Sequence, residues 1–483
     1  MADSICNIGN RKRVFIDWDL IEPGYGVACC GEKATSWEMP YGVQIAVHAP
    51  RIYPRPLVWP ENPWESRINV YSTLFEDEGR YRLYYECYYL DEKDRVTDFG
   101  AMMAYAESID GVNWVKPKIG TIRFNGSVDN NLVYGLDLSL GRGAHAGTVF
   151  KDPNAPSDQR YKLVHTGREA GRLCVFGAIS PDGLRWKALK KPLIADYKSD
   201  TQTGIRFDSE KGRYVGYFRG WKGLEPGKWH GRRTIAYAES DRFETWPVPQ
   251  TIVAPDVNDN PDTDIYTNSY TRWPGVADAH LMFPAFYQRA LDVLEVHLMT
   301  SRDGLRWERP TRRPIIPSGE PGSDWEGGVY AGCGLVSMQP GEWSLPIGPK
   351  WHTHNQGRFP EGWPSILPNR GYLCRAIWRQ DGFTSLEAQS EGKCSTVPIT
   401  FSGKYLEINA WTRFAGEIRV ELAEASGETI AAHTFADCDP ISGDALKHTV
   451  TWKGESDLSA WAGKPMRLRF WLRRARLYAI QFV

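Results

Sequence analysis

The chain alternates apolar and polar residues in short runs, which is the pattern of half-buried β-strands. Groups of three such runs recur in five successive blocks, and hardly any amphipathic helix of ordinary length is expected before residue 390. The third run of each block leads into one phrase, found at 108–114, 180–186, 240–246, 301–307 and, degraded, 379–385. Three copies read Ser-x-Asp-Gly-x-x-Trp, in which Asp-Gly supplies a tight turn because glycine accepts positive φ. A hairpin phrase that returns five times predicts one supersecondary unit used five times.

The five blocks predict the blades of a β-propeller, because their length fits a four-stranded blade with insertions. The predicted inner strands are residues 67–75, 144–151, 203–208, 265–273 and 328–338. Two further strands are predicted earlier in the chain, within 11–22 and 42–48. We expect at least one of these two to pair with the last blade, because closing the ring removes exposed sheet edges.

After the fifth phrase the alternating runs continue without the repeat, which predicts a separate β-sandwich of about a hundred residues. The predicted fold is therefore all-β, with a catalytic five-bladed β-propeller over residues 1–390 and an accessory β-sandwich over 391–483.

Composition narrows the class of protein. The net charge is −1 without a run of like charges, which argues against a nucleic-acid partner. No apolar run is long enough to span a bilayer, and the first 14 residues lack the apolar core of a signal peptide. A cytoplasmic location is expected, or a secreted one if a leader has been removed. The nine cysteines are scattered without a C-x-x-C, so we expect buried thiols rather than disulfides or a zinc site.

Carboxylates recur just before the predicted inner strands, at Glu65, Asp200, Asp264 and Glu326. These strand ends line one mouth of a propeller channel, so we predict that the four acids are catalytic. Convergent carboxylates suit glycosidic cleavage, since one protonates the leaving oxygen and another attacks or activates water. Crowding also raises the pKa of a carboxyl group, which keeps an acid protonated. The alternative is that each acid satisfies backbone amides or pairs with an arginine.

The same strand starts carry all of the predicted substrate-binding residues except His354. Aromatic content is 13%, and aromatic side chains serve both sheet cores and sugar-binding clefts. The predicted binding residues are Trp64, Arg142, His145, Tyr266, Trp325 and His354. For His145 a satisfied core histidine is an equal alternative. His352 and His354 form an H-x-H pair without nearby acids, which is usually a loop and not a metal site, so we expect no metal and no cofactor.

The five phrases, the Phe-Lys-Asp-Pro run at 150–153 and the trailing sandwich resemble the five-bladed propeller glycoside hydrolases of families 32, 43, 62 and 68. The resemblance implies three acids: a nucleophile or base, a stabiliser, and a general acid. By position Glu65 takes the first role and Asp200 the last, while His145 or Asp152 stands in the second slot. The Asn-Asp-Pro-Asn-Gly motif of family 32 is missing, and Glu86-Cys87 matches its Glu-Cys motif on the wrong blade, so the chain resembles a divergent member.

The predicted function is hydrolysis of glycosidic bonds in an oligo- or polysaccharide. One alternative is a phosphorolytic enzyme of the family 130 type, with Arg142, Arg219 and His354 around the phosphate. Another is a propeller that binds carbohydrate without catalysis, because propellers serve many functions. The sequence leaves open the sugar, the linkage, the stereochemical course and the oligomeric state.

Overall fold

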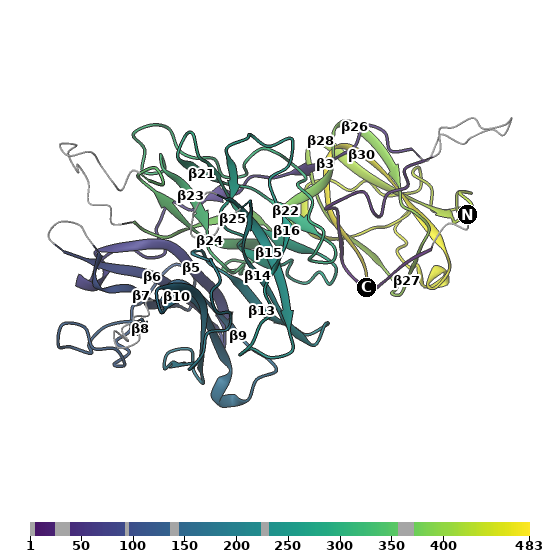
Figure 1. Cartoon of the computed structure of the whole chain (residues 1–483). Coiled ribbons are helices and arrows are strands. Elements are labelled where there is room, and N and C mark those ends of the chain that lie inside the picture. Colours follow the sequence, from purple (N-terminus) through teal and green to yellow (C-terminus); the bar gives the residue numbers. More distant parts are fainter. Residues whose placement is uncertain (1–4, 25–38, 92–95, 136–143, 224–230, 356–370) are drawn as a thin grey trace. The chain divides into compact units, whose positions relative to one another are not determined.

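The structure is a computed structural model of the 483-residue chain, and it describes residues 5–24, 39–91, 96–135, 144–223, 231–355 and 371–483. Strands and a few short 3₁₀ turns are the regular elements of the described chain, so the all-β prediction is confirmed (Figure 1). It divides into two compact units. The propeller unit comprises 50–271 and 280–377, and the terminal unit comprises 1–49, 272–279 and 378–483. No helix in the described ranges has the length and apolar content needed to cross a membrane.

The first three repeats of the propeller unit each form a separate four-stranded antiparallel sheet. The first consists of β5 (Arg67–Asp77), β6 (Arg80–Leu90), β7 (Val96–Ser108) and β8 (Leu132–Tyr134). The second consists of β9 (His145–Lys151), β10 (Tyr161–Glu169), β11 (Arg172–Ser180) and β12 (Lys187–Ala188). The third consists of β13 (Gly204–Asp208), β14 (Arg213–Lys222), β15 (Arg232–Ser240) and β16 (Gln250–Val253).

The fourth repeat is split along its length, because each of its strands is interrupted. One half is β18 (Tyr270–Arg272), β19 (His280–Met282) and β22 (Met299–Ser301); the other is β17 (Thr263–Ile265), β20 (Ala285–Gln288) and β21 (Val293–Val296). The fifth repeat is β23 (Gly328–Ala331), β24 (Glu342–Lys350), β25 (Cys374–Arg379) and β4 (Arg51–Ile52). β21 pairs with β23 at Leu294 and Gly328, which joins these repeats in one seven-stranded sheet. The propeller arrangement is confirmed, and five separate blades stay a prediction.

The ring is closed by β4, whose Ile52 pairs with Ala376 of β25. The prediction that a strand within 11–22 or 42–48 does this is wrong. β2 (Arg13–Val14) pairs instead with β30 (Met466–Phe482), and β3 (Gln44–Val47) pairs with β26 (Thr384–Ser395). A two-residue strand such as β4 is too short to show the period-two alternation by which strands are found in a sequence.

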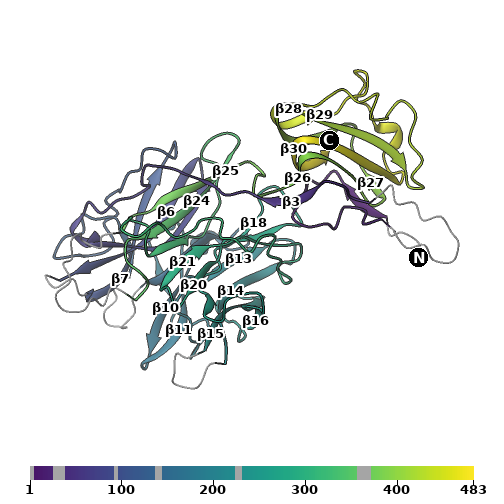
Figure 2. The same ribbon diagram turned by 90° about the horizontal axis from the view of Figure 1, so that it is seen from above.

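The terminal unit is one connected eight-stranded sheet around its own apolar core. β28 (Leu406–Glu424) and β30 pair along their lengths, and Figure 2 shows them beside β29 (Asp444–Thr449). The remaining strands are β1 (Cys6–Gly9) and β27 (Ile399–Phe401). The unit differs in extent from the predicted sandwich at 391–483, because it also contains residues 1–49, 272–279 and 378–390.

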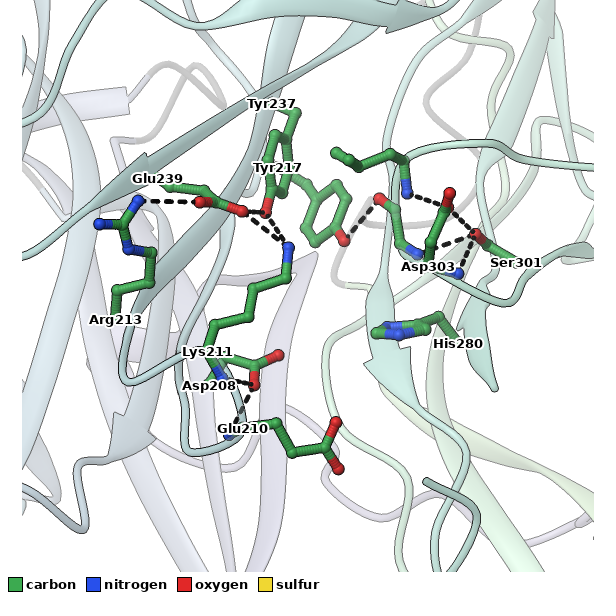
Figure 3. A network of polar contacts seen from close by, with 12 residues as sticks. Asp208, Glu210, Lys211, Arg213, Tyr217, Tyr237, Glu239, His280, Ser301 and Asp303 are labelled. Carbon is green, nitrogen blue, oxygen red and sulfur yellow. Dashed lines mark hydrogen bonds and ion pairs between the residues drawn. The ribbon is translucent and has the colours of Figure 1, made fainter. Parts of the chain in front are cut away.

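The repeat phrase forms the same turn in three copies. The serine hydroxyl accepts a hydrogen bond from the glycine amide at 2.9 Å each time, and the aspartate accepts bonds from the next two amides at 2.8 Å; the turns are Ser108–Asn113, Ser180–Arg185 and Ser301–Arg306. The turn also docks on the preceding repeat. The hydroxyl of Tyr217 in β14 donates to the carbonyl oxygen of Gly304 at 2.9 Å (Figure 3). The turn formed by the repeat phrase therefore connects neighbouring repeats.

In each of the first three repeats, a tyrosine at the start of the second strand makes another contact, or joint, with a neighbouring repeat. The Tyr161 hydroxyl donates to Asp77 at 2.5 Å, and the Tyr214 hydroxyl donates to Asp152 at 2.5 Å. The Tyr81 hydroxyl donates to the carbonyl oxygen of Ser337 at 2.7 Å. These joints lie where the inner strands end, so the starts of those strands remain available for a site.

Candidate active site

The starts of the inner strands bring together five side chains, which we call the mouth cluster: Tyr71, His145, Asp200, Tyr266 and Tyr330. The Tyr71 ring lies 5.5 Å from that of His145 and 6.3 Å from that of Tyr330 between ring centroids. The Tyr266 and Tyr330 rings are 5.8 Å apart. Asp200 precedes β13, and its carbonyl oxygen lies 3.2 Å from His145 Nε2. Each residue comes from a different repeat, as the propeller arrangement requires.

Glu86 of β6 holds the imidazole of His145 in place. Its Oε1 lies 3.0 Å from His145 Nδ1, and its Oε2 accepts from the Ala146 amide at 2.6 Å. Asn69 donates to Oε1 at 2.8 Å, and the Tyr88 hydroxyl also donates to it. Ala146 has a φ of 56°, a left-handed conformation that non-glycine residues adopt when the surroundings fix them. The Glu86 carboxylate is thus completely engaged.

These contacts shift the pKa of both partners. Burial alone raises the pKa of Glu86, but the facing imidazole and the hydrogen bonds bring it below its ordinary value. Burial likewise lowers the pKa of His145, but the Glu86 carboxylate and Asp200 bring it above its ordinary value. Opposite charges favour the ionised form of each partner. Both shifts favour a carboxylate facing an imidazolium, and 34% of the His145 side chain remains exposed.

Asp200 is the predicted catalytic acid that lies in the mouth cluster. Its Oδ1 accepts from Nη1 of Arg219 at 2.6 Å, and 29% of its side chain is exposed. Arg219 is completely buried, donates to the Tyr266 carbonyl oxygen at 2.7 Å and lies 4.4 Å over the Tyr266 ring. Burial raises the pKa of Asp200, but Arg219, Arg233 and His145 bring it below its ordinary value. Asp200 is therefore an ionised carboxylate in contact with water.

The other three predicted acids have structural partners. Glu65 is buried in the interior of the first repeat, where its Oε2 accepts from Lys116 Nζ at 2.9 Å and its Oε1 accepts from the Tyr85 hydroxyl. The 3₁₀ turn at Pro63–Glu65 directs it there, away from the mouth cluster. Glu326 accepts from the Gly322 amide at 2.7 Å within its own loop.

Asp264 is completely buried behind the mouth cluster and is held between two arginines. Arg233 Nη1 donates to Oδ2 at 2.7 Å, and Arg289 donates to both oxygens, at 2.9 and 2.7 Å. With both oxygens engaged, Asp264 positions Arg233, whose guanidinium lies 4.9 Å over the Tyr266 ring.

Three of the predicted binding residues lie in the site: His145, Tyr266 and His354. The ring of His354 is 4.8 Å from that of Tyr266, and its Nδ1 lies 3.0 Å from the Tyr330 hydroxyl. Burial and the nearby cations Lys350, Arg233 and Arg219 lower the pKa of His354 to about 4, so its imidazole is neutral.

Two other predicted binding residues, Trp64 and Trp325, lie elsewhere. Trp64 donates to Asn131 at 2.7 Å inside the first repeat, and Trp325 donates to the Tyr372 hydroxyl at 3.1 Å. Arg142 lies outside the described residues. Asp152, the alternative acid of the second slot, is buried in its joint with Tyr214.

The second strands of three repeats also contribute side chains near the site, and of these only Arg219 is assigned a role from the sequence, in the phosphorolytic alternative. They are Glu86 and Tyr88 of β6, Arg219 and Trp221 of β14, and Lys350 of β24. Glu86 carries a usable signal, because a carboxylate inside an aromatic strand needs a buried partner. Among the residues that the structure describes, no three His, Cys, Asp or Glu side chains gather as a metal site.

Comparison with known proteins finds solved structures that resemble this chain. No family model matches the chain, and no curated protein matches it. A solved structure described as a glycoside hydrolase covers 68% of this chain and 92% of its own, at 15% identity and a TM-score of 0.48. A structure from work on mannoside phosphorylases and hydrolases of family GH130 covers 69% and 94%, at 12% identity and a TM-score of 0.47.

An N-acetylgalactosamine deacetylase from F. plautii, in complex with blood group B trisaccharide, covers 71% of this chain and 97% of its own, at 14% identity and a TM-score of 0.45. All three structures are at most 15% identical to this chain, with TM-scores of at most 0.48, so they carry no argument about its function. The function is therefore argued from the side chains of this protein.

Proposed function

We propose that the propeller unit hydrolyses glycosidic bonds and that Asp200 supplies the ionised carboxylate of the reaction. The observation that carries the proposal is the state of Asp200, which is paired with buried Arg219 yet keeps 29% of its side chain open to solvent. A structural acid, such as Asp264, has no exposed side-chain surface. Asp200 therefore has both the charge and the access that a base in glycosidic cleavage requires.

The lowered pKa changes the role that the family resemblance implies for Asp200. An ionised carboxylate has no proton to give, so it suits the base or nucleophile and not the general acid. The proton donor in this proposal is His145, whose imidazolium is exposed on one side and lies beside Asp200. Its Nε2, which lies 3.2 Å from the Asp200 carbonyl oxygen in the free protein, gives its proton to the leaving oxygen as the glycosidic C–O bond breaks. Water adds to the anomeric carbon and gives a proton to Asp200.

The surroundings of Asp200 support a sugar as the substrate. Trp221 is partly exposed, donates to the Lys198 carbonyl oxygen at 2.7 Å, and lies 5.6 Å from the Arg219 guanidinium. An aromatic face held beside charged groups offers a sugar both apolar contact and hydrogen bonds.

The test is product analysis after incubation with natural oligosaccharides and aryl glycosides, with and without phosphate. We expect release of a free sugar, and we expect Asp200→Asn to lower the rate about 10²- to 10⁴-fold, the usual contribution of a positioned acid or base. Asp129→Asn removes an exposed carboxylate of the same unit and serves as the matched control. Saturable binding without turnover across the panel would instead support a carbohydrate-binding propeller.

One observation favours phosphorolysis as a second candidate. Two of the three residues predicted to surround a phosphate, Arg219 and His354, both lie within 5 Å of the Tyr266 ring, at 4.4 and 4.8 Å. Formation of a sugar phosphate that requires inorganic phosphate would select this candidate over hydrolysis.

A further inference from the structure

Two cationic side chains, Arg67 and Lys350, lie at the seam between the first and fifth repeats, beside the mouth cluster. Arg67 is the first residue of β5, and Lys350 is the last of β24. The strands touch along the seam: a Cβ on Gly348 would lie 2.8 Å from the Cα of Val70. This close approach continues toward the start of β5, so Lys350 lies beside Arg67.

Neither cation forms an ion pair within the described chain, although the charge of Asp292 reaches Lys350. No ion pair or hydrogen bond joins the Arg67 or Lys350 side chain to any residue that the structure describes, and Arg67 Nε is buried without an acceptor. The neighbouring acids are already engaged. Glu86 is bound as described above, and Asp292 accepts from the Tyr287 hydroxyl at 2.6 Å and from two nitrogens of Asn355 at 2.7 Å.

Both cations also connect to the mouth cluster through one tyrosine each. The Arg67 guanidinium lies 4.8 Å over the Tyr88 ring, and the Tyr88 hydroxyl is 3.2 Å from His145 Nδ1. Lys350 Nζ lies 6.0 Å from the centroid of the Tyr330 ring. A group bound between Arg67 and Lys350 would therefore sit next to the residues proposed to act on the glycosidic bond.

Two like charges at a partly desolvated position destabilise each other. Burial, together with the charge of Arg67, lowers the pKa of Lys350 to about 8. An anion placed between them would reverse this effect, because it attracts both cations and supplies acceptors for their donors.

We propose that Arg67 and Lys350 bind an anionic group carried by the sugar, so that the propeller unit recognises an acidic glycan. The shared chemistry is an oxyanion, either the carboxylate of a uronic acid or a sulfate ester. The planar guanidinium, stacked on Tyr88, matches two oxygens of such a group, and the ammonium supplies a second, mobile donor. Binding of the acidic glycan does not depend on the proposed function. Only the further statement that the bound glycan is cleaved rests on it.

The test is calorimetric binding to the full chain carrying Asp200→Asn, which holds the substrate without turnover if the proposed function is right. The probes are oligogalacturonides, glucuronate-containing oligosaccharides, sulfated galacto-oligosaccharides, their neutral counterparts, and inorganic phosphate. We expect acidic members to bind, and Lys350→Gln or Arg67→Gln to weaken binding about ten- to a hundred-fold, as lost charged hydrogen bonds do. Lys118→Gln, at an exposed lysine, is the matched control and leaves binding unchanged.

Binding of carboxylated but not sulfated sugars, or the reverse, names the source of the oxyanion. Neutral sugars that bind as tightly as acidic ones, or binding of inorganic phosphate alone, would overturn the proposal. If a variant fails to fold, the salt dependence of binding to the parent protein decides instead, because charge-driven binding weakens as salt rises. Acidic glycans that bind without cleavage by the wild-type chain would leave this inference standing and remove the proposed hydrolysis.

Discussion

The imidazole of His145 links two repeats, since its Nδ1 lies 3.0 Å from the carboxylate of Glu86 in β6 while His145 itself begins β9. The protonation of His145, the proposed proton donor, therefore depends on Glu86, a residue that the substrate does not contact. Glu86 is therefore a positioning residue, and its contribution is open to measurement by pH.

Replacement of Glu86 by Gln should move the pH profile of cleavage. Without the carboxylate the pKa of His145 falls, so activity that needs the imidazolium is lost at a lower pH than in the wild type. The basic limb of the kcat profile shifts toward acid, and the control Glu76→Gln, at an exposed position, leaves it in place. A lower kcat with an unmoved basic limb would contradict this role.

The same pair should stabilise the fold within a limited pH window. The lowered pKa of Glu86 gives stability above its unfolded value of 4.5, which is lost as the pH falls through the folded pKa. The raised pKa of His145 gives stability below its unfolded value of 6.5, which is lost as the pH rises through the folded pKa. The melting-temperature difference between wild type and Glu86→Gln should therefore be greatest between these two values. A difference that is constant with pH would show that the pair does not titrate in this way.

Asp200 and Asp264 should separate activity from stability. Asp264→Asn leaves Arg233 and Arg289 without their buried carboxylate, and breaking such a pair lowers the free energy of unfolding by about 3–5 kcal/mol. Asp200→Asn leaves one buried arginine, Arg219, without its carboxylate, whereas Asp264→Asn leaves two arginines so. We therefore expect Asp200→Asn to cause a smaller loss of unfolding free energy, together with a loss of cleavage of about 10²- to 10⁴-fold. Equal loss of stability in the two variants would contradict the distinction drawn between them.

Binding of an acidic oligosaccharide should weaken as the pH rises through about 8, where Lys350 loses its proton. The charged groups that face this lysine are Arg67 of β5 and Asp292 after β20. Burial, and then the charge of Lys350, lower the pKa of the nearby His352 and His354. A bound anion holds the proton on, so the inflection should move upward in the complex. Lys350→Arg keeps its charge throughout this range, and its affinity should not change near pH 8. An identical inflection in that variant would assign the titration to another group.

Asp152 should behave as a structural residue in spite of its place in the Lys-Asp-Pro run. Tyr214→Phe removes the hydroxyl that donates to it, and an unsatisfied buried acceptor costs about 1–3 kcal/mol of unfolding free energy. We expect cleavage per folded molecule to be unchanged. Tyr41→Phe, at an exposed tyrosine, is the control for loss of a hydroxyl. Loss of cleavage with unchanged stability would return Asp152 to the catalytic site.

The docking of the repeat turns can be tested with two glycines of similar φ. Gly183 has a φ of 77°, and a Cβ there would lie 2.5 Å from the Tyr84 hydroxyl; Gly212 has a φ of 66° and open space around it. Both alanine variants incur backbone strain, but only Gly183→Ala also meets a neighbouring repeat. We therefore expect Gly183→Ala to lower the melting temperature more than Gly212→Ala does. An equal decrease in melting temperature in the two variants would show that the turn does not contribute to the contact between repeats.

The sequence predicts the repeats well because each one carries a local signal. The Asp-Gly turn of Ser180–Arg185 depends on side chains within six residues, so its geometry follows from the local sequence. The ring-closing strand β4 has no such signal, because only its pairing with β25 defines it.

The location of the candidate site was predictable from the sequence, but most of the residues that form it were not. The starts of the inner strands meet as expected, which brings together Asp200, His145 and Tyr266. Whether an acid at such a start faces the axis depends on the backbone just before the strand, and the 3₁₀ turn at Pro63–Glu65 turns Glu65 inward. Arg67 and Lys350 come from opposite ends of the propeller sequence, so only the closed ring makes them neighbours.

The tyrosine and turn joints described above lie at the ends of the inner strands, whereas the mouth cluster lies at their starts. A ring fastened at one rim leaves the other rim free to vary during evolution. Insertions or deletions in the segments around the cluster would break none of those joints, and a duplicated gene could acquire a new sugar preference while keeping its stability.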